Sequence, residues 1–253
     1  MNTTPWLIPR LGVNIDHIAT LRQLRGTPYP DLLEAAALVK KAGAHQLTIH
    51  LREDRRHIQD ADVVALRKKG GLPLNLECAL APSMLKIALK VKPDWVCLVP
   101  ERRQEVTTEG GLDVKKYRTR IKKAIADFKK KGIRVSLFIE PDASVVRLSK
   151  ELGADAVEIH TGKYCNATQK FYGKNSAKIE KAEFKRLQDA IRAGRETGIH
   201  LHAGHGFDFK NVRKIAALDV IEEFNIGHAI VCRAALVGLE QAVREMIAAI
   251  HAP

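Results

Sequence analysis

The amino-acid sequence predicts an α/β fold, specifically a (β/α)8 TIM barrel with a few extra helices, and three observations support this prediction. Eight short β-type runs alternate along the chain with longer amphipathic segments. The 253 residues contain no long linker or change in composition, so we expect one domain over residues 1–253. Several helical segments end in glycine, a common C-terminal stop signal. A doubly wound open sheet is the structural alternative, but that fold gives no reason for the number of strand–helix units to be eight.

The expected strands are short runs rich in apolar and β-branched residues: Leu11–Asp16, Gln46–Leu51, Leu72–Cys78, Trp95–Pro100, Arg134–Glu140, Ala156–His160, His200–Ala203 and Phe224–Gly227. The expected helices repeat apolar residues every three or four positions: Asp31–Ala42, Asp60–Lys69, Pro82–Val91, Asp113–Lys131, Ala143–Leu152, Lys178–Glu196, Asn211–Leu218 and Ala234–His251. The stretches 17–30 and 163–178 exceed ordinary loop length, so each is expected to be a lid or an extra helix.

Composition excludes several classes of protein. Hydrophobic residues make up 45% and charged residues 28%, which excludes collagen-like and wholly disordered chains. The longest uncharged stretch has 11 residues, whereas a membrane-spanning helix needs about 20. No signal-peptide pattern opens the sequence, and its cysteines (Cys78, Cys97, Cys165 and Cys232) form no C-x-x-C pair. We therefore expect reduced thiols, a cytoplasmic location and no membrane partner.

The formal net charge of +13 predicts a positive field that attracts anions. The densest basic segment, residues 115–131, carries nine Lys or Arg, but apolar residues recur in it every three or four positions. That pattern is typical of a helix with an apolar stripe and a solvated basic face. The segment has no zinc-finger spacing, RNP-type strand or basic zipper, so we predict no nucleic-acid partner and favour small phosphate esters as the anions.

The predicted strands end in polar side chains, and in a barrel of this kind the carboxyl ends of the strands form the active site. The polar side chains there are Asn14, Asp16, His17, His50, Arg52, Glu77, Glu140, Glu158, His160, His205 and His228. A lone histidine at such a place is usually a structural residue that makes hydrogen bonds. Five histidines on one rim instead indicate acid–base chemistry.

Glycine-containing motifs follow the last two strands, where barrel enzymes commonly hold a phosphate on backbone N–H groups. These motifs are 204–206 (Gly-His-Gly) and 227–228 (Gly-His), and the alternative is two ordinary tight turns. The run 52–57 and the Thr107-Thr108 pair, with glycines at 110 and 111, are candidates for a second anion site. For Arg55 and Arg56 the alternative is a solvated loop with internal Glu–Arg pairs.

Motifs for other chemistries are missing from the sequence. No lysine ends a predicted strand, with Lys163 the nearest, so we expect no imine between enzyme and substrate. His200 and His202 share a strand face, but alternation places His200 deep in the barrel or on the helix side, and no H-E-x-x-H motif is present. Neither a dinucleotide fingerprint nor a P-loop occurs. We therefore predict no metal and no cofactor.

Segments spread over the whole chain resemble the pyridoxine 5′-phosphate synthase family. They read LGVNIDHIATLR (11–22), HLREDRRHI (50–58), NLE (75–77), LVPE (98–101) with QEVTTEGGLD (104–113), EIHTG (158–162), AGHG (203–206) and NIGHA (225–229). The resemblance implies condensation of 1-deoxy-D-xylulose 5-phosphate with 3-amino-2-oxopropyl phosphate, giving pyridoxine 5′-phosphate, phosphate and water in vitamin B6 biosynthesis. The two substrates supply the amine and the ketone, so no enzyme lysine, metal or nucleotide is required.

The resemblance also implies roles for particular residues. His50 and Glu77 would be general bases, His205 a general acid and Glu158 a transition-state stabiliser. The residues implied for the aminoketone phosphate are Asn14, Arg25, Gly206, Gly227 and His228. Those implied for the deoxyxylulose phosphate are Asp16, His17, Arg52, His57 and Thr107. The family further implies a homo-octamer built from dimers.

Two alternative functions are compatible with the predicted barrel. The first is another cofactor-free barrel enzyme on phosphorylated sugars, such as an isomerase or epimerase, for which one substrate alone would turn over. The second is a nucleic-acid-binding protein that uses the +13 charge on an inactive barrel, for which binding would weaken steeply with salt.

Overall fold

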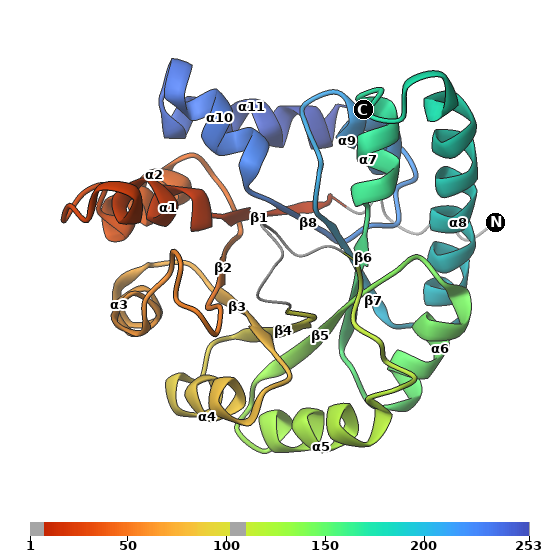
Figure 1. Ribbon diagram of the computed structural model, residues 1–253, viewed down its shortest axis with the longest axis horizontal. Coiled ribbons are helices and arrows are strands. Elements are labelled where there is room, and N and C mark those ends of the chain that lie inside the picture. The colour runs from red at the N-terminus through yellow and green to blue at the C-terminus, as the bar shows by residue number, and fades with distance from the viewer. Residues whose placement is uncertain (1–7, 102–109, 253) are drawn as a thin grey trace.

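The computed structural model describes residues 8–101 and 110–252, and within them eight parallel strands form a closed barrel, with β1 pairing both β2 and β8 (Figure 1). The strands are β1 (Arg10–Asn14), β2 (Gln46–His50), β3 (Leu74–Ala79), β4 (Trp95–Val99), β5 (Arg134–Ile139), β6 (Ala156–His160), β7 (His200–Gly204) and β8 (Glu223–Ile226). The predicted (β/α)8 barrel is confirmed.

Helices surround this ring of strands on the outside (Figure 1). They are α1 (Asp16–Arg25), α2 (Leu32–Lys41), α3 (Asp60–Lys69), α4 (Pro82–Val91), α5 (Arg118–Lys129), α6 (Ala143–Glu151), α7 (Gly162–Thr168), the 3-10 turn η1 (Gly173–Asn175), α8 (Ser176–Thr197), α9 (Asn211–Ala216), α10 (His228–Val237) and α11 (Leu239–His251). Among these, α1 lies mostly in the long stretch 17–30 and α7 mostly in the stretch 163–178. Each stretch therefore contains an extra helix, which was one of the two alternatives expected.

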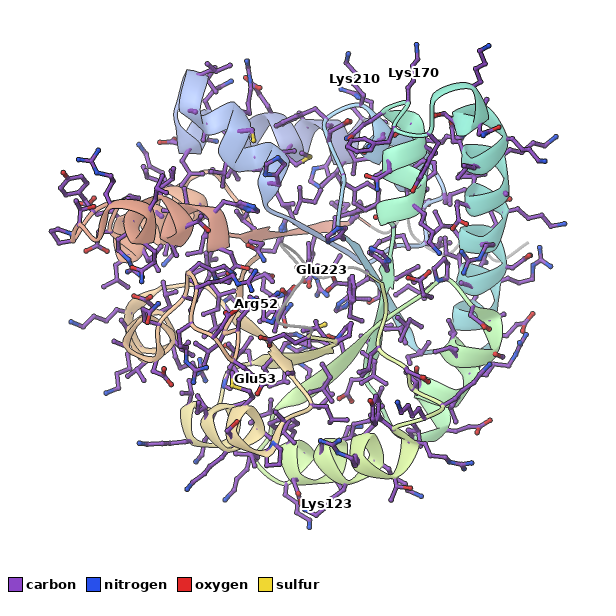
Figure 2. The ribbon with its side chains drawn as sticks, viewed as in Figure 1. Arg52, Glu53, Lys123, Lys170, Lys210 and Glu223 are labelled. Atoms are coloured by element: carbon purple, nitrogen blue, oxygen red, sulfur yellow. The ribbon has the colours of Figure 1, made fainter. Side chains whose placement is uncertain are left out.

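Side chains alternate along the strands between an apolar outer face and a polar inner face. The outward residues Leu47 and Ile49 are fully buried under the helices. Inward, the Thr48 hydroxyl donates to Asn225 Oδ1 at 2.9 Å, and the Gln46 amide donates to Glu223 Oε1 at 2.7 Å. Barrels of this type usually fill the interior with branched aliphatic residues. In this barrel the interior beneath the carboxyl ends of the strands contains hydrogen-bonded polar side chains instead. One of them, Glu223, lies near the centre of the ring of strands (Figure 2).

Two predicted helices have the wrong bounds. The last helix begins earlier, at His228, and is divided by Gly238, whose φ of 84° cannot continue an α-helix, into α10 and α11. The helix predicted from Asp113 starts only at Arg118, because Asp113 Oδ1 accepts the Lys116 N–H in a turn that precedes it. Alternation of apolar residues does not distinguish such a turn from a first helical turn.

The basic helix α5 has the orientation that its pattern predicts. Ile121, Ile125 and Phe128 are buried against the barrel. Lys123 points away from the molecule, as do Lys170 and Lys210 on other segments (Figure 2). The basic face of α5 is therefore a solvated surface. Within residues 8–101 and 110–252, no helix combines the length and the apolar character needed to cross a membrane.

Candidate active site

The ends of β1, β2 and β3 bring four of the predicted residues together. His50 and Glu77 are partners in the register of β2 and β3, and the His50 backbone N–H donates to Asp16 Oδ1 at 2.8 Å. Asn14 fixes this aspartate, because its side-chain amide donates to Asp16 Oδ2 at 3.0 Å and its Oδ1 accepts the Asp16 N–H at 2.9 Å. The chain thus turns from β1 into α1 with Asp16 held against β2.

Glu77 and Glu158 place two carboxyl groups inside the mouth of the barrel. Burial, together with the nearby charges of Glu158 and Asp16, raises the pKa of Glu77 well above its ordinary value. Burial raises the pKa of Glu158 to about 8, although the Asn225 amide donates to its Oε2 at 2.8 Å and opposes the shift. Both groups therefore hold protons at pH values where ordinary carboxyl groups are ionised.

Glu101, which follows β4, joins the site although the sequence motifs gave it no role. Its carboxylate oxygens lie 3.7 Å from His50 Nε2 and 3.7 Å from Arg52 Nε, and the side chains of all three are at most 5% exposed. Burial opposes ionisation here, but the nearby His50 and Arg52 and the hydrogen bond from the Glu53 N–H outweigh it and lower the pKa of Glu101. An ionised Glu101 can orient His50 and neutralise Arg52. Its position directly after a strand in LVPE was the signal that could have identified it.

His17 and His57 lie at the same rim. Burial lowers the pKa of both imidazoles, and the neighbouring His228 lowers that of His17 further. The ring centroids of His17 and His228 are 4.9 Å apart. His57 Nδ1 accepts the Ile58 N–H at 2.8 Å, so the ring proton of neutral His57 resides on Nε2.

The glycine motifs after β7 and β8 lie side by side, since Gly204 and Asn225 are register partners. Gly206 has a φ of 87°, a left-handed conformation that glycine adopts readily. The neighbouring helix α10 begins at His228. Its first N–H to donate to a backbone carbonyl of the same helical turn is that of Val231, which donates to the Gly227 carbonyl at 3.0 Å. The preceding N–H groups are available to an anion, so this corner has the chemistry of a phosphate site.

His205 lies between the two glycines in a strained backbone conformation. Its φ is 74°, unfavourable for a residue with a side chain, and the Thr161 hydroxyl donates to the carbonyls of Gly204 at 2.8 Å and His205 at 2.7 Å. Burial, assisted by the charge of His160, lowers the pKa of His205 to about 4. The surrounding hydrogen bonds hold the ring at the rim in spite of the strain.

Not every predicted residue joins this cluster. Arg25 is exposed in the last turn of α1, and no other described residue bonds to it. Thr107 lies outside the described residues. Arg55 Nε is 2.7 Å from Asp60 Oδ2 and Arg56 Nη2 is 2.6 Å from Asp54 Oδ2, so both arginines form ion pairs as the loop alternative expected, but with aspartates and not with glutamates.

His200 is at the amino end of β7, away from the rim. Its Nδ1 lies 2.8 Å from Glu222 Oε2. Within the part of the chain that the structure describes, no three His, Cys, Asp or Glu side chains gather as a metal site would require.

Three further polar residues were not assigned roles from the sequence. Asn225 connects Thr48 to Glu158, and Glu140 Oε1 lies 2.8 Å from His160 Nδ1. Glu140 and His160 stood out as polar residues at strand ends, but no motif indicated that they pair. The inward positions of alternating strands were the signal that could have identified Asn225.

Comparisons with known proteins agree with this geometry. The family model described as "Pyridoxal phosphate biosynthesis protein PdxJ" matches residues 11–252. A protein of Syntrophotalea carbinolica named pyridoxine 5'-phosphate synthase is 53% identical over 93% of this chain and 96% of its own length. A protein of the same name from Geobacter sulfurreducens is 52% identical over 94% of this chain and 97% of its own length.

Solved structures share the fold at low sequence identity. Phosphoribosyl anthranilate isomerase from Thermus thermophilus superposes with a TM-score of 0.57 at 14% identity, covering 95% of this chain and 98% of that one. N-acetylmannosamine-6-phosphate 2-epimerase from Clostridium perfringens gives 0.56 at 14% identity, covering 91% and 93%. At this identity the likeness concerns the fold alone. The match along residues 11–252, together with relatives about half identical, shows that the chain belongs to the PdxJ family of pyridoxal phosphate biosynthesis proteins.

Proposed function

We propose that this chain is a pyridoxine 5′-phosphate synthase, a ring-closing enzyme of the transferase class. It condenses 1-deoxy-D-xylulose 5-phosphate with 3-amino-2-oxopropyl phosphate to pyridoxine 5′-phosphate, phosphate and water. The observation that carries the proposal is the rim itself, where Glu77 and Glu158 have raised pKa values beside His50 and His205. Family membership and the names of the two relatives support the same reaction.

His50 and Glu77 are the proposed general bases. Imine formation, dehydration and aromatisation remove several protons in sequence, and a base works best when its pKa lies near the working pH. Glu77 meets this condition because burial raises its pKa. His50 is held through its backbone N–H on Asp16 and faces the carboxylate of Glu101. That carboxylate stabilises the imidazolium that forms when His50 takes a proton.

His205 is the proposed general acid and Glu158 the proposed transition-state stabiliser. A pKa of about 4 leaves His205 neutral at pH 7 in the free protein. A phosphate bound beside Gly206 would favour the charged imidazolium, so substrate binding would promote protonation of His205. Glu158, with a pKa of about 8, is protonated at neutral pH and can donate a hydrogen bond to an oxygen that gains charge.

The two phosphate groups have separate proposed sites. The aminoketone phosphate would bind at the glycine corner of β7 and β8, where Asn14, Gly206, Gly227 and His228 converge, with Arg25 as a further contact from the family resemblance. The deoxyxylulose phosphate would bind on the residues after β1, β2 and β4, which are Asp16, His17, Arg52, His57 and Thr107. The free helical N–H groups of α10 support the first assignment, and the buried Arg52 supports the second.

We also infer a single domain, a cytoplasmic location and a homo-octamer built as a tetramer of dimers, all three by family. The exposed leucines Leu24 on α1, at 77%, and Leu236 on α10, at 80%, support burial of this surface in an oligomer. Sedimentation velocity tests the assembly, with the octamer as the expected species and a monomer at micromolar concentration as the contradicting one.

The function is tested by stoichiometry. Purified protein is given each substrate alone and then both together, while pyridoxine 5′-phosphate and inorganic phosphate are measured in the same samples. We expect equal amounts of both products with the pair and no turnover of either substrate alone. Isomerisation or epimerisation of a single substrate, without ring formation, would instead support the first alternative function.

A further inference from the structure

The Glu140 carboxylate and the His160 imidazole form a pair next to the His205 ring. Glu140 Oε1 lies 2.8 Å from His160 Nδ1, and the His160 side chain is only 7% exposed. Glu140 directly follows β5 and His160 ends the neighbouring strand β6, and the family resemblance assigns a role to neither. A buried carboxylate–imidazole pair beside a catalytic histidine is the arrangement that sets ring orientation and proton affinity in other enzymes.

Glu140 is held in its ionised form. It is half-buried, yet the hydrogen bond from His160 lowers its pKa to about 2, with help from Lys163 and the Gly111 N–H. The Gly111 N–H donates to Oε1 at 3.1 Å, while Lys163 Nζ and Arg186 Nη2 lie 3.8 and 3.7 Å from Oε2. An ionised carboxylate only accepts hydrogen bonds, so Nδ1 of His160 carries a proton in every charge state. Glu140 thereby fixes the tautomer and the orientation of His160.

His160 in turn contacts His205. Their ring centroids are 4.9 Å apart with planes at 65°, and Phe138 packs on both rings. Gly162 at the start of α7 leaves room for this pair, since a Cβ there would stand 2.6 Å from His160 Nε2 and 3.0 Å from His205 Cδ2. The His205 ring is therefore enclosed by His160, Phe138 and the backbone of α7.

We propose that Glu140 and His160 are positioning residues for His205, which keep its ring in place at the rim and control how readily it holds a proton. This inference rests on the proposed function for its catalytic consequence, but its structural part does not depend on the reaction. Neither residue is placed in contact with substrate. Their effect passes through the imidazole of His205.

The direction of the effect follows from the charges that face these groups. His205 faces His160 on β6, Phe138 on β5 and Gly162 on α7, and of these only His160 can oppose its protonation by charge. The Nδ1–H of His160 donates to Glu140 Oε1 at 2.8 Å. Glu140 itself faces Lys163 on α7 and Arg186 on α8. Removing His160 therefore makes His205 easier to protonate, whereas removing the Glu140 carboxylate acts through the orientation of the His160 ring.

The test measures His205 without substrate. The variants are His160→Gln and Glu140→Gln, and the His205 imidazole is followed by ¹⁵N NMR through a pH titration, its signals assigned by their loss in His205→Asn. We expect the midpoint, about 4 in the wild type, to rise by at least about half a pH unit in His160→Gln. In the two-substrate reaction we expect kcat to fall roughly 10- to 100-fold, as when the carboxylate partner of a functional histidine is lost. KM should change less than about twofold, and Glu140→Asp should restore part of kcat.

The matched control is Glu222→Gln. It breaks a second glutamate–histidine pair, Glu222 with His200 at 2.8 Å, at the opposite end of the barrel. This variant should leave the His205 midpoint and kcat unchanged. If Glu140→Gln and His160→Gln lower only the melting temperature and titrate like the control, the pair is structural and the proposal is wrong. An inactive wild type with a shifted midpoint in His160→Gln would refute the synthase function but not the positioning.

Discussion

The most informative residue for stability is Glu158, because its raised pKa makes folding depend on pH. The folded protein holds this proton up to about pH 8, whereas the unfolded chain releases it near 4.5. Between these values the folded state binds more protons, so the stability contributed by the protonated carboxyl is lost as the pH rises through this window. A glutamine at this position has no such dependence.

We therefore predict that Glu158→Gln gains thermal stability relative to the wild type as the pH is raised from 5 to 8.5. The expected relative gain in Tm is at least about 3 °C, equivalent to roughly 1 kcal/mol in a chain of this length. Glu223, whose pKa burial raises to about 7, titrates in both proteins and cancels in the comparison. Differential scanning fluorimetry across this range provides the measurement, and parallel Tm curves for the two proteins would rule out a buried proton on Glu158.

A second prediction at the residue scale concerns His205. Its lowered pKa means that His205, the proposed general acid, is neutral at pH 7 in the free protein, and a phosphate bound beside Gly206 would stabilise its charged form. Saturating inorganic phosphate should therefore raise the His205 midpoint by about one pH unit or more in an NMR titration. The buried His202, with a pKa of about 3, lies lower in the barrel and should not respond. Equal responses of both histidines would contradict a phosphate site at Gly206.

At the scale of elements, the turn after β7 is where the proposed phosphate site depends on the backbone itself. Gly206 and Gly198 both have left-handed φ angles, 87° and 61°, so an alanine at either position costs about 1 kcal/mol of conformational strain. Only at Gly206 would the added Cβ meet other atoms, 2.9 Å from Cys165 Cβ, while at Gly198 it would meet open space.

We predict that Gly206→Ala raises KM for 3-amino-2-oxopropyl phosphate by about tenfold or more, because a shift of about 1 Å removes N–H contacts with the phosphate. Gly198→Ala should lose similar stability with unchanged kinetics. Steady-state kinetics and melting temperatures of both variants are the required data. The same KM in the two variants would place the phosphate elsewhere.

The elements differ in how far sequence could predict them. Strand positions followed from apolar runs and flanking glycines, and all eight are present. Alternation could not show that His228 starts a helix immediately after β8, because the short segment before Gly238 also suits a loop. Among site residues, His50 and Glu77 were predictable from their strand ends. The Glu140–His160 pair was not, since its partners are 20 positions apart and meet only when β5 and β6 pair.

For the whole molecule, the dominant property is its positive charge. The net charge is +13, and side chains such as Lys123, Lys170 and Lys210 point outward (Figure 2). Such a field raises the local concentration of doubly charged phosphate esters, and salt screens it over about 10 Å at 0.1 M.

We predict that raising NaCl from 0.02 to 0.3 M increases KM for both substrates by roughly three- to tenfold while kcat changes little. Sucrose at matched viscosity is the control and should have no such effect. A salt-independent KM would show that the charge has another role, and tight salt-sensitive binding of RNA or DNA would favour the second alternative function.

The barrel is shared with isomerases and epimerases, so the fold does not choose among these chemistries. The chemistry proposed for the rim does, because it would combine several proton-transfer groups with two separate anion sites. An isomerase needs one base and one phosphate site, whereas condensation of two phosphorylated substrates needs both sites and several proton transfers.

The most direct measurement compares wild type and Glu77→Gln in the two-substrate reaction, following pyridoxine 5′-phosphate and inorganic phosphate together. We predict equal product yields for the wild type and a loss of roughly 10²- to 10⁴-fold in the variant, with circular dichroism and Tm showing that it is folded. A folded Glu77→Gln protein that forms both products at the wild-type rate would contradict acid–base catalysis by the buried carboxyl at this rim.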